Sequence, residues 1–277
     1  MSKDNKRNYI LNFENKIEKM NKRFLRNFYS TLVFPGEEEV HNLRISIREL
    51  NEGAEISSAI LNKKLPNFLI KLKGLLKVLG KLRDLHVENK IIIEKFGEKF
   101  NLESEIAETQ SEIKNLLNGF DIDLLEIDIK KLHNEIEKIL KKLDIKKVEK
   151  RIKSYLSKKY SNLIKKTSLS DFNKIEELHR IRVAYKKFRY SAEALKDYLC
   201  LTKADLKRLK KIQDILGEIN DLQNITVNIE DLKKKKNYRI THEKMNAIII
   251  EKYEKIEIFH YVLESEKIYW KHLISRC

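Results

Sequence analysis

The chain has 277 residues, and its 58 lysines and arginines exceed its 42 acidic residues to give a formal net charge of +16. Such a charge favours an anionic partner, either a nucleic acid, a phosphate polymer or a membrane surface. Two cysteines without a CxxC pair argue against a disulfide framework or a cysteine zinc site, and no apolar run is long enough to span a membrane. The first residues also lack the apolar core of a signal peptide, so we expect a cytoplasmic protein without a membrane partner.

Helix breakers are scarce, with 7 glycines and 2 prolines in the whole chain. This scarcity predicts long helices joined by short connections. Apolar residues recur at spacings of three and four, as amphipathic helices require, and no segment alternates in the way a half-buried strand does. The sequence therefore predicts an all-α fold.

The first charged motif is VHNLRISIREL, which begins at Val40 and holds His41, Arg44 and Arg48. The next segment ends in LGKLRDL, residues 79–85. Its basic residues are Lys71, Lys73, Lys77, Lys81 and Arg83. We expect a helix end or a close helix approach at Gly80.

The only dense acidic run is DIDLLEID, residues 121–128. It lies in the least basic part of the chain, outside the charged motifs. We interpret it as a solvated loop and the start of a helix, in preference to a metal site.

The second charged motif is LHRIRVAYKKFRYSAEAL, residues 178–195. At about 100° per residue, one arc of roughly 80° carries a histidine, three cations and a carboxylate. These are His179, Arg182, Lys186, Arg189 and Glu193, with Lys187 outside the arc. The opposite face is expected to enter the core through Ile181, Ala184, Phe188, Ala192 and Leu195. A solvated face is the simpler interpretation. However, cations that follow one another along one helix face cost a few tenths of a kcal/mol per pair. A bound anion explains this arrangement better.

The two motifs are copies of one pattern. His41, Arg44 and Arg48 align with His179, Arg182 and Lys186, and LGKLRDL aligns with LGEINDL (216–222) at nearly the same offset. Two motifs repeated in order indicate an internal duplication. Each copy predicts a Leu-Gly turn between helices, followed by an aspartate, Asp84 or Asp221, that caps the next helix or pairs with an arginine. The second copy adds basic residues before its glycine: Lys207, Arg208, Lys210 and Lys211. The last segment, from Ile248, reads as a long amphipathic helix.

This doubled set of motifs resembles the CHAD domain, an α-helical family defined by its histidines. The resemblance covers residues 10–277 as one domain of two repeats, about 10–145 and about 146–277. It implies two four-helix bundles related by a pseudo-twofold axis around a central basic channel. It also implies that the ligand is inorganic polyphosphate, that the domain binds and does not catalyse, and that it uses no cofactor or metal. Polyphosphate granules and polyphosphate-metabolising proteins are the location and partners that the resemblance suggests.

The resemblance carries over to particular positions. The basic motif of the family matches His41, Arg44, Arg48, His179, Arg182, Lys186, Lys187 and Arg189, with Tyr190 and Glu193 at accompanying positions. We add further candidate contacts on the following helices: Lys73, Lys77, Arg83, Lys207, Lys210 and Lys211. Glu55 and Glu193 are expected to orient a neighbouring arginine or lysine. Glu49 and Asn51 depart from the family pattern, which would weaken ligand binding by the first copy or shift it to Lys73, Lys77 and Arg83.

These residue types suit a polymer that offers charge but no bases or sugars. Arginine donates in a planar, bidentate manner, whereas lysine supplies a compact point charge. Histidine donates from both nitrogens once protonated, and a nearby anion raises its pKa. We therefore hypothesise that His41 and His179 bind phosphate as imidazolium, so that affinity rises as the pH falls toward 6.

Three other functions stay open from the sequence. A nucleic-acid binder fits the charge and the basic segment 231–244, although Tyr160, Tyr185 and Tyr190 are more typical of core residues than of a stacking platform. A phosphohydrolase would need metal-binding carboxylates or an activated nucleophile, for which no motif is evident. A scaffold that binds a partner protein through its amphipathic helices would also be compatible with the pattern.

Overall fold

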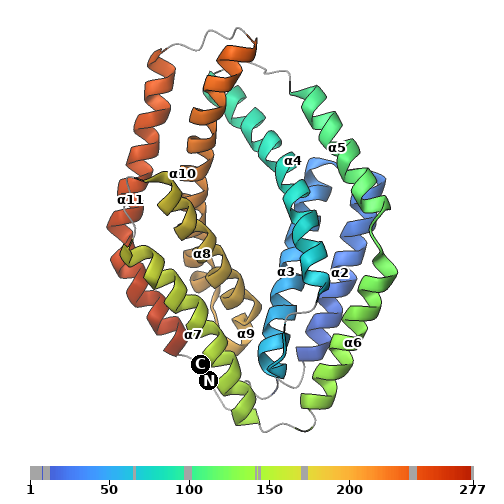
Figure 1. The fold of residues 1–277 in the computed structure, drawn as a ribbon. Coiled ribbons are helices and arrows are strands. Elements are labelled where there is room, and N and C mark those ends of the chain that lie inside the picture. The colour runs from blue at the N-terminus through green and yellow to red at the C-terminus, as the bar shows by residue number, and fades with distance from the viewer. Residues whose placement is uncertain are drawn as a thin grey trace.

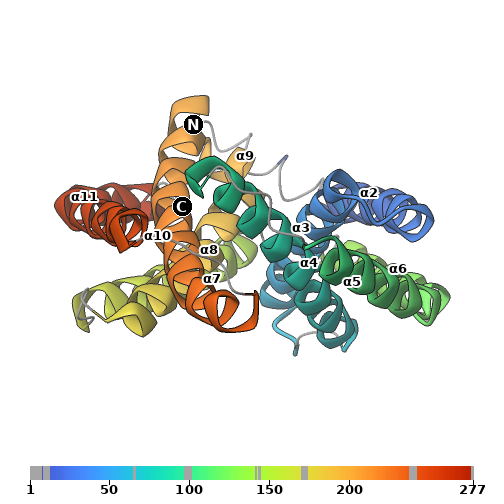
Figure 2. The same cartoon turned by 90° about the horizontal axis from the view of Figure 1, so that it is seen from above.

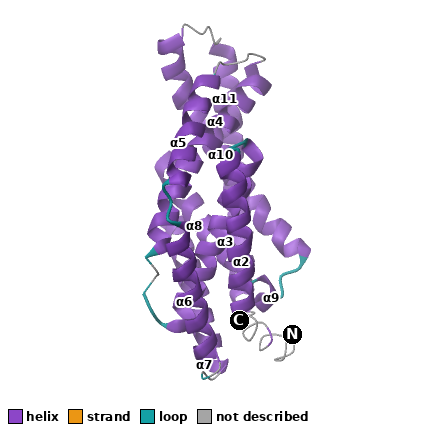
Figure 3. Ribbon diagram, turned by 90° about the vertical axis from the view of Figure 1, so that its right-hand side faces the viewer, coloured by secondary structure: helices purple, strands orange, loops and turns teal. Residues whose placement is uncertain are grey.

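A computed structural model describes residue 8 and residues 13–64, 67–96, 102–140, 142, 145–169, 174–236 and 242–275 of the chain. Within these ranges there are ten helices and no strand (Figure 1, Figure 3). The expected all-α class is therefore confirmed. None of the described helices is both long and apolar enough to cross a membrane.

The helices fall into two groups by their contacts. The first group contains α2 (Phe13–Val33), α3 (Glu37–Leu61), α4 (Phe68–Phe96), α5 (Glu103–Asn118) and α6 (Ile122–Leu140). The second contains α7 (Ile145–Leu169), α8 (Ile175–Ala194), α9 (Lys196–Leu199), α10 (Lys203–Lys236) and α11 (His242–Ser275). The groups lie side by side, and α3 packs on α7 and α8 while α4 touches α10 (Figure 1, Figure 2). The two helices that carry the charged motifs, α3 and α8, therefore meet between the groups.

Local sequence signals account for the bounds of α3. Three glutamates, residues 37–39, occupy its first turn, where the positive end of the helix dipole stabilises negative charge. At the other end Asn62 adopts the left-handed conformation with φ of 55°, and its N–H bonds to the carbonyls of Ala59 and Ser58. This cap satisfies carbonyl groups that the helix itself leaves without donors.

One apolar face of α8 anchors the second group. The side chains of Ile181, Ala184, Phe188, Ala192 and Leu195 are all buried, which confirms the expected core-facing stripe. Trp270 of α11 packs against this helix, with its ring centroid 5.3 Å from that of Tyr185 and 6.1 Å from that of Phe188. The opposite face of α8 is thereby directed away from α11.

The predicted Leu-Gly turns are wrong. Gly80 lies inside α4 and Gly217 inside α10, so neither glycine ends a helix, and neither Asp84 nor Asp221 caps one. A single glycine costs only about 1 kcal/mol in a helix interior, and the buried leucines on either side outweigh that cost. The alternative expectation, a close approach of helices, fails at Gly217, where a Cβ would meet no other helix of the described residues within 4 Å. At Gly80 a Cβ would meet the guanidinium end of Arg44, 2.9 Å from Nη1.

Candidate anion-binding site between α3 and α8

Four cations from the two motif helices share one electrostatic environment. Arg44 and Arg48 of α3 both lower the pKa of Lys186 on α8, as does Arg182. Arg48 also acts on Arg44 and on Arg182. We call these four residues, Arg44, Arg48, Arg182 and Lys186, the cation cluster.

The side chains of the cluster are half-buried, and burial makes their charged forms less favourable. Burial, followed by the charge of Arg48, lowers the pKa of Arg44 to about 10. Burial, followed by the three arginines, lowers the pKa of Lys186 to about 7. Desolvation and like charge both disfavour the protonated form, so the site stores unfavourable energy that a bound anion would relieve.

Two carboxylates partly balance the cluster. Asp221 of α10 and Asp84 of α4 both favour the charged form of Arg182, and Asp84 also favours that of Arg44. Burial, with a further contribution from Asp84, raises the pKa of Asp221 despite the nearby Arg182. These aspartates therefore act electrostatically on the arginines.

One guanidinium donor of the cluster has no hydrogen-bond partner in the described part of the chain. Nη1 of Arg44 reaches the Leu76 carbonyl at only 3.4 Å, through the space that Gly80 leaves open. Nε of Arg182 is buried, and no residue in the described part of the chain accepts a hydrogen bond from it. Buried donors are normally satisfied, so this N–H is a candidate donor to an anionic ligand.

Aromatic and acidic neighbours hold the remaining arginines. The Tyr190 ring lies beneath Arg48, 5.6 Å from its guanidinium carbon, and beneath Arg189 at 5.7 Å. Arg189 donates from Nε to Glu193 at 2.8 Å, and burial raises the pKa of that glutamate. Arg189 is thus already paired by the glutamate expected to orient a neighbour, whereas Arg48 contacts the Tyr190 ring through a cation–π interaction.

The two motif histidines lie at the exposed edge of this site. Burial, then the charges of Arg83 and the cluster arginines, lowers the pKa of His41, and Arg83 itself pairs with Glu37. Nδ1 of His179 lies 3.2 Å from Oδ1 of Asn220 on α10. His179, Arg182 and Asn220 share a pocket of about 330 Å³ between α8 and α10.

Comparison with known proteins identifies the family of this chain. A family model, described as the CHAD domain, matches residues 32–224, which include every residue of the cation cluster. The chain belongs to the CHAD domain family. Among solved structures it is similar to the crystal structure of the CHAD domain from the plant Ricinus communis, with 17% identity, 95% of this chain and 89% of that chain covered, and a TM-score of 0.56. At that identity the likeness shows the fold alone, and a comparison with curated proteins finds no significant match.

Six further candidate lysines of this CHAD domain are exposed: Lys73, Lys77, Lys187, Lys207, Lys210 and Lys211. Helical spacing places Lys73 and Lys77 on the face of α4 that carries Asp84, and Lys207 and Lys210 on the face of α10 that carries Asp221. Lys211 differs, because it acts electrostatically on Glu266 of α11, beside the ion pair of that glutamate with Arg208 at 2.8 Å. Lys211 therefore belongs to the contact between α10 and α11.

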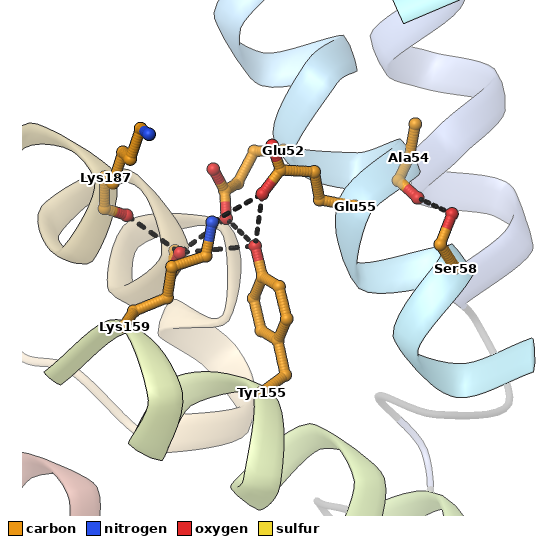
Figure 4. Close-up of polar contacts among 8 residues, drawn as sticks. Glu52, Ala54, Glu55, Ser58, Tyr155, Lys159 and Lys187 are labelled. Atoms are coloured by element: carbon orange, nitrogen blue, oxygen red, sulfur yellow. Dashed lines mark hydrogen bonds and ion pairs between the residues drawn. The ribbon is translucent and has the colours of Figure 1, made fainter. Parts of the chain in front are cut away.

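Glu55 lies away from the cluster, in a polar network that joins α3 to α7 and α8 (Figure 4). It pairs with Lys159, which holds its pKa below the usual value although burial acts in the opposite direction. One helical turn earlier, the buried Glu52 accepts hydrogen bonds of 2.5 Å from Tyr155 and from Ser191. Burial raises the pKa of Glu52. Glu55 thus engages a lysine of α7 and not an arginine of the motif.

Several residues of the site and of the polar network beside Glu55 were not named from the sequence. They are Glu37, Glu52, Tyr155, Lys159 and Asn220. The glutamate run at the start of α3 was a usable signal for Glu37, because carboxylates cluster at helix N-termini. The others are recognisable only through the packing of α3 and α10 against α7 and α8.

The acidic run forms the first turns of α6. Oδ1 of Asp121 accepts a hydrogen bond of 2.9 Å from the Leu124 backbone, as a helix-capping aspartate does. The described residues hold no group of three histidine, cysteine or acidic side chains that could bind a metal. Of the basic segment 231–244, residues 237–241 lie outside the described residues.

Proposed function

We propose that this CHAD domain binds inorganic polyphosphate at the cation cluster. The observation that carries the proposal is the meeting of α3 and α8, which brings four cations from two copies of one motif together with only partial compensation. Phosphate oxygens would replace the missing counter-charge and would accept from donors such as Nε of Arg182. The family is a binding domain whose members bind polyphosphate, and this supports the same ligand.

The surroundings of the cluster favour polyphosphate over nucleic acid. Proteins that bind single-stranded nucleic acid hold its bases by stacking them on exposed aromatic rings. The Tyr190 ring is covered by Arg48 and Arg189, and Tyr185 is buried with its hydroxyl bonded to the Leu209 carbonyl at 2.7 Å. A ligand that offers phosphates without bases uses the donors of this site more completely.

The proposal extends to the organisation of the chain. We infer a single non-catalytic domain over residues 10–277, with repeats of about 10–145 and about 146–277 that form two four-helix bundles around a basic channel. The exposed lysines of α4 and α10 would line that channel on either side of the cluster. A cytoplasmic location at polyphosphate granules, with polyphosphate-metabolising partners, is the setting that the family suggests.

Direct titration with long-chain polyphosphate at near-physiological salt tests the proposal, with RNA of similar charge as competitor. The double variant Arg44→Gln, Arg182→Gln removes one cluster arginine from each motif helix. The matched control Lys153→Gln, Lys158→Gln removes the same charge from the exposed surface of α7.

We expect the cluster variant to bind at least tenfold more weakly than the wild type and the α7 variant to bind within about twofold, since specific charge-assisted contacts outweigh general attraction. RNA should compete poorly. Equal losses in both variants, or full competition by RNA, would refute a specific polyphosphate site.

A further inference from the structure

Helix α11 is apolar on two opposite faces, but only one of them is buried. Its inner face packs on α10 and α7, and Trp270 on that face is fully buried. Both views of the fold place α11 at the outer edge of the second group (Figure 1, Figure 2). Its outer face carries large apolar side chains with exposed fractions between 46% and 90%: Ile250, Tyr253, Ile258, Tyr261 and Ile268. Helices that are apolar all round are normally buried all round, so this outer face is a candidate contact surface.

These exposed apolar residues form one stripe along the helix, which we call the outer stripe. At about 100° per residue, Ile250, Tyr261 and Ile268 lie within about 20° of one another around the helix axis. Tyr253 and Ile258 flank them within about 80°. The stripe extends for about 27 Å at 1.5 Å per residue. That length suits a helix of about twenty residues laid alongside α11.

The charge on the outer stripe is opposite to the charge of the protein. Three glutamates, Glu254, Glu257 and Glu264, are exposed among its apolar residues, within about 40° of Ile250 around the axis. Glu264 pairs with the half-buried Lys267 at 2.7 Å, which still leaves the stripe negative. The whole chain, in contrast, has a net charge of +16.

Two lysines of α11 beside the stripe are turned toward α10. Nζ of Lys252 donates to Oε1 of Gln223 at 3.2 Å, and Lys255 pairs with Glu218 at 2.5 Å. Both acceptors belong to α10. The packing of α11 thus separates its charges, with these lysines against the neighbouring helix and the glutamates on the outer face.

We propose that the outer stripe docks an amphipathic helix of a partner protein whose apolar residues are flanked by lysines and arginines. Apolar side chains of the partner at spacings of three and four would cover Tyr261 and Ile268, and its cations would pair with Glu254 and Glu257. The inference goes beyond the proposed function. The stripe lies on the face of α11 opposite Trp270, which packs toward α8, so the partner and a ligand at the cation cluster bind to different faces.

Charge disfavours two other occupants of this surface. A twofold contact with a second copy uses the same surface on both subunits, so it would set the glutamates of one stripe against those of the other. An anionic membrane would also be repelled, because helices that lie on such membranes bind them through lysines and arginines.

Two synthetic peptides of about twenty residues test the expected chemistry of the partner. Both carry leucines at spacings of three and four, with lysine at the remaining positions in one and glutamine in the other. Fluorescence anisotropy with the full chain measures their binding. We expect the leucine–lysine peptide to bind at least about fivefold more tightly. The net charge of +16 alone would give the reverse order, so equal or weaker binding of the lysine peptide, or none, would overturn the proposal.

Substitutions at matched exposure locate the binding surface. Tyr261→Ser, Ile268→Ser changes stripe residues that are 90% and 72% exposed. The control Val33→Ser, Ile70→Ser changes residues of α2 and α4 that are 79% and 71% exposed. We expect the stripe variant to bind the leucine–lysine peptide at least about tenfold more weakly than the wild type, and the control to bind within about twofold. Equal losses in the two variants would show that the peptide binds elsewhere and would refute the assignment to α11.

Two further measurements on the same variants decide between the possible occupants. Sedimentation at increasing protein concentration detects a dimer, and vesicles of phosphatidylcholine and phosphatidylserine detect membrane binding. We expect the wild type and the variant Tyr261→Ser, Ile268→Ser to behave alike in both. A dimer or a vesicle complex that forms with the wild type and is lost in that variant would assign the stripe to a second copy or to a membrane and overturn the proposal.

Discussion

At the scale of single residues, the cluster shows how the cost of crowding positive charge depends on the side chain. Arg44 and Arg182 keep their charge although burial lowers the pKa of both, because the pKa of a guanidinium group starts far above neutrality. Lys186 holds a compact ammonium that loses more on desolvation, which is why its pKa falls furthest toward neutrality. The pattern therefore places one lysine, whose charged form is disfavoured, among arginines that stay charged.

Gly80 gives a prediction at the same scale. In Gly80→Ala the new Cβ would lie 2.9 Å from Nη1 of Arg44, so the guanidinium must move, while the helix gains about 1 kcal/mol of propensity. We expect unchanged or slightly higher stability together with several-fold weaker polyphosphate binding. Thermal unfolding and the polyphosphate titration measure the two effects.

Gly217→Ala is the matched control in the other motif. Its Cβ would meet no side chain or neighbouring helix of the described residues within 4 Å, so we expect up to about 1 kcal/mol of added stability and unaltered binding. Equal effects of the two substitutions on binding would show that Arg44 does not depend on the space beside Gly80.

At the scale of the helices, α3 makes the main connection between the two groups. It packs against α7 and α8 of the second group as well as against its neighbours in the first. Its contacts across the junction are polar at Glu52 and Glu55, and the cation cluster lies at positions toward its N-terminus. Because one rigid helix carries both features, the network around Glu52 helps to fix the position from which Arg44 and Arg48 face α8.

The buried Glu52 predicts how stability depends on pH. Burial raises its pKa in the folded protein above the unfolded value, so its contribution to stability increases as the pH falls from 7 toward 5. Glu52→Gln should remove this dependence and stay within about 1 kcal/mol of the wild type at pH 7, because the amide oxygen still accepts from Tyr155 and Ser191. Urea unfolding at pH 5, 6 and 7 measures it.

Glu52→Ala separates the hydrogen bonds from the charge. It leaves the hydroxyls of Tyr155 and Ser191 without this acceptor, which costs about 1–3 kcal/mol. An alanine variant as stable as the glutamine variant, or a glutamine variant with the pH dependence of the wild type, would contradict the role given to Glu52.

At the scale of the whole molecule, the net charge of +16 attracts any polyanion, whereas the proposed site at the cation cluster would contact its ligand directly. Salt separates the two contributions, because each phosphate contact releases counterions on binding. We expect the logarithm of the polyphosphate binding constant to fall linearly with the logarithm of salt concentration. The slope should be smaller by about 1 for each cation removed from the cluster, or about 2 in Arg44→Gln, Arg182→Gln.

Titrations at four salt concentrations measure that slope. The α7 control Lys153→Gln, Lys158→Gln should keep the slope of the wild type. An unchanged slope in the cluster variant would mean that Arg44 and Arg182 do not contact the ligand, whatever the change in affinity.

The sequence by itself determined the local features of this protein. Spacings of three and four predicted the helices, and the wheel of residues 178–195 identified the stripe from Ile181 to Leu195 that is buried. The duplicated motifs also paired positions such as Asp84 and Asp221, which act on the same arginine. These features are predictable because helix periodicity and repeated spacing are properties of neighbouring residues.

Tertiary structure decided which of these features work together. Only the packing of α3 on α8 places Arg44 and Arg48 beside Lys186, and only the packing of α3 on α7 gives Glu55 a lysine for a partner. The two glycines were wrongly predicted to end helices, because that prediction considered only the backbone flexibility of glycine. The buried residues on either side keep both helices continuous. The low pKa of Lys186 likewise follows from burial and from charges distant in sequence, which no local pattern contains.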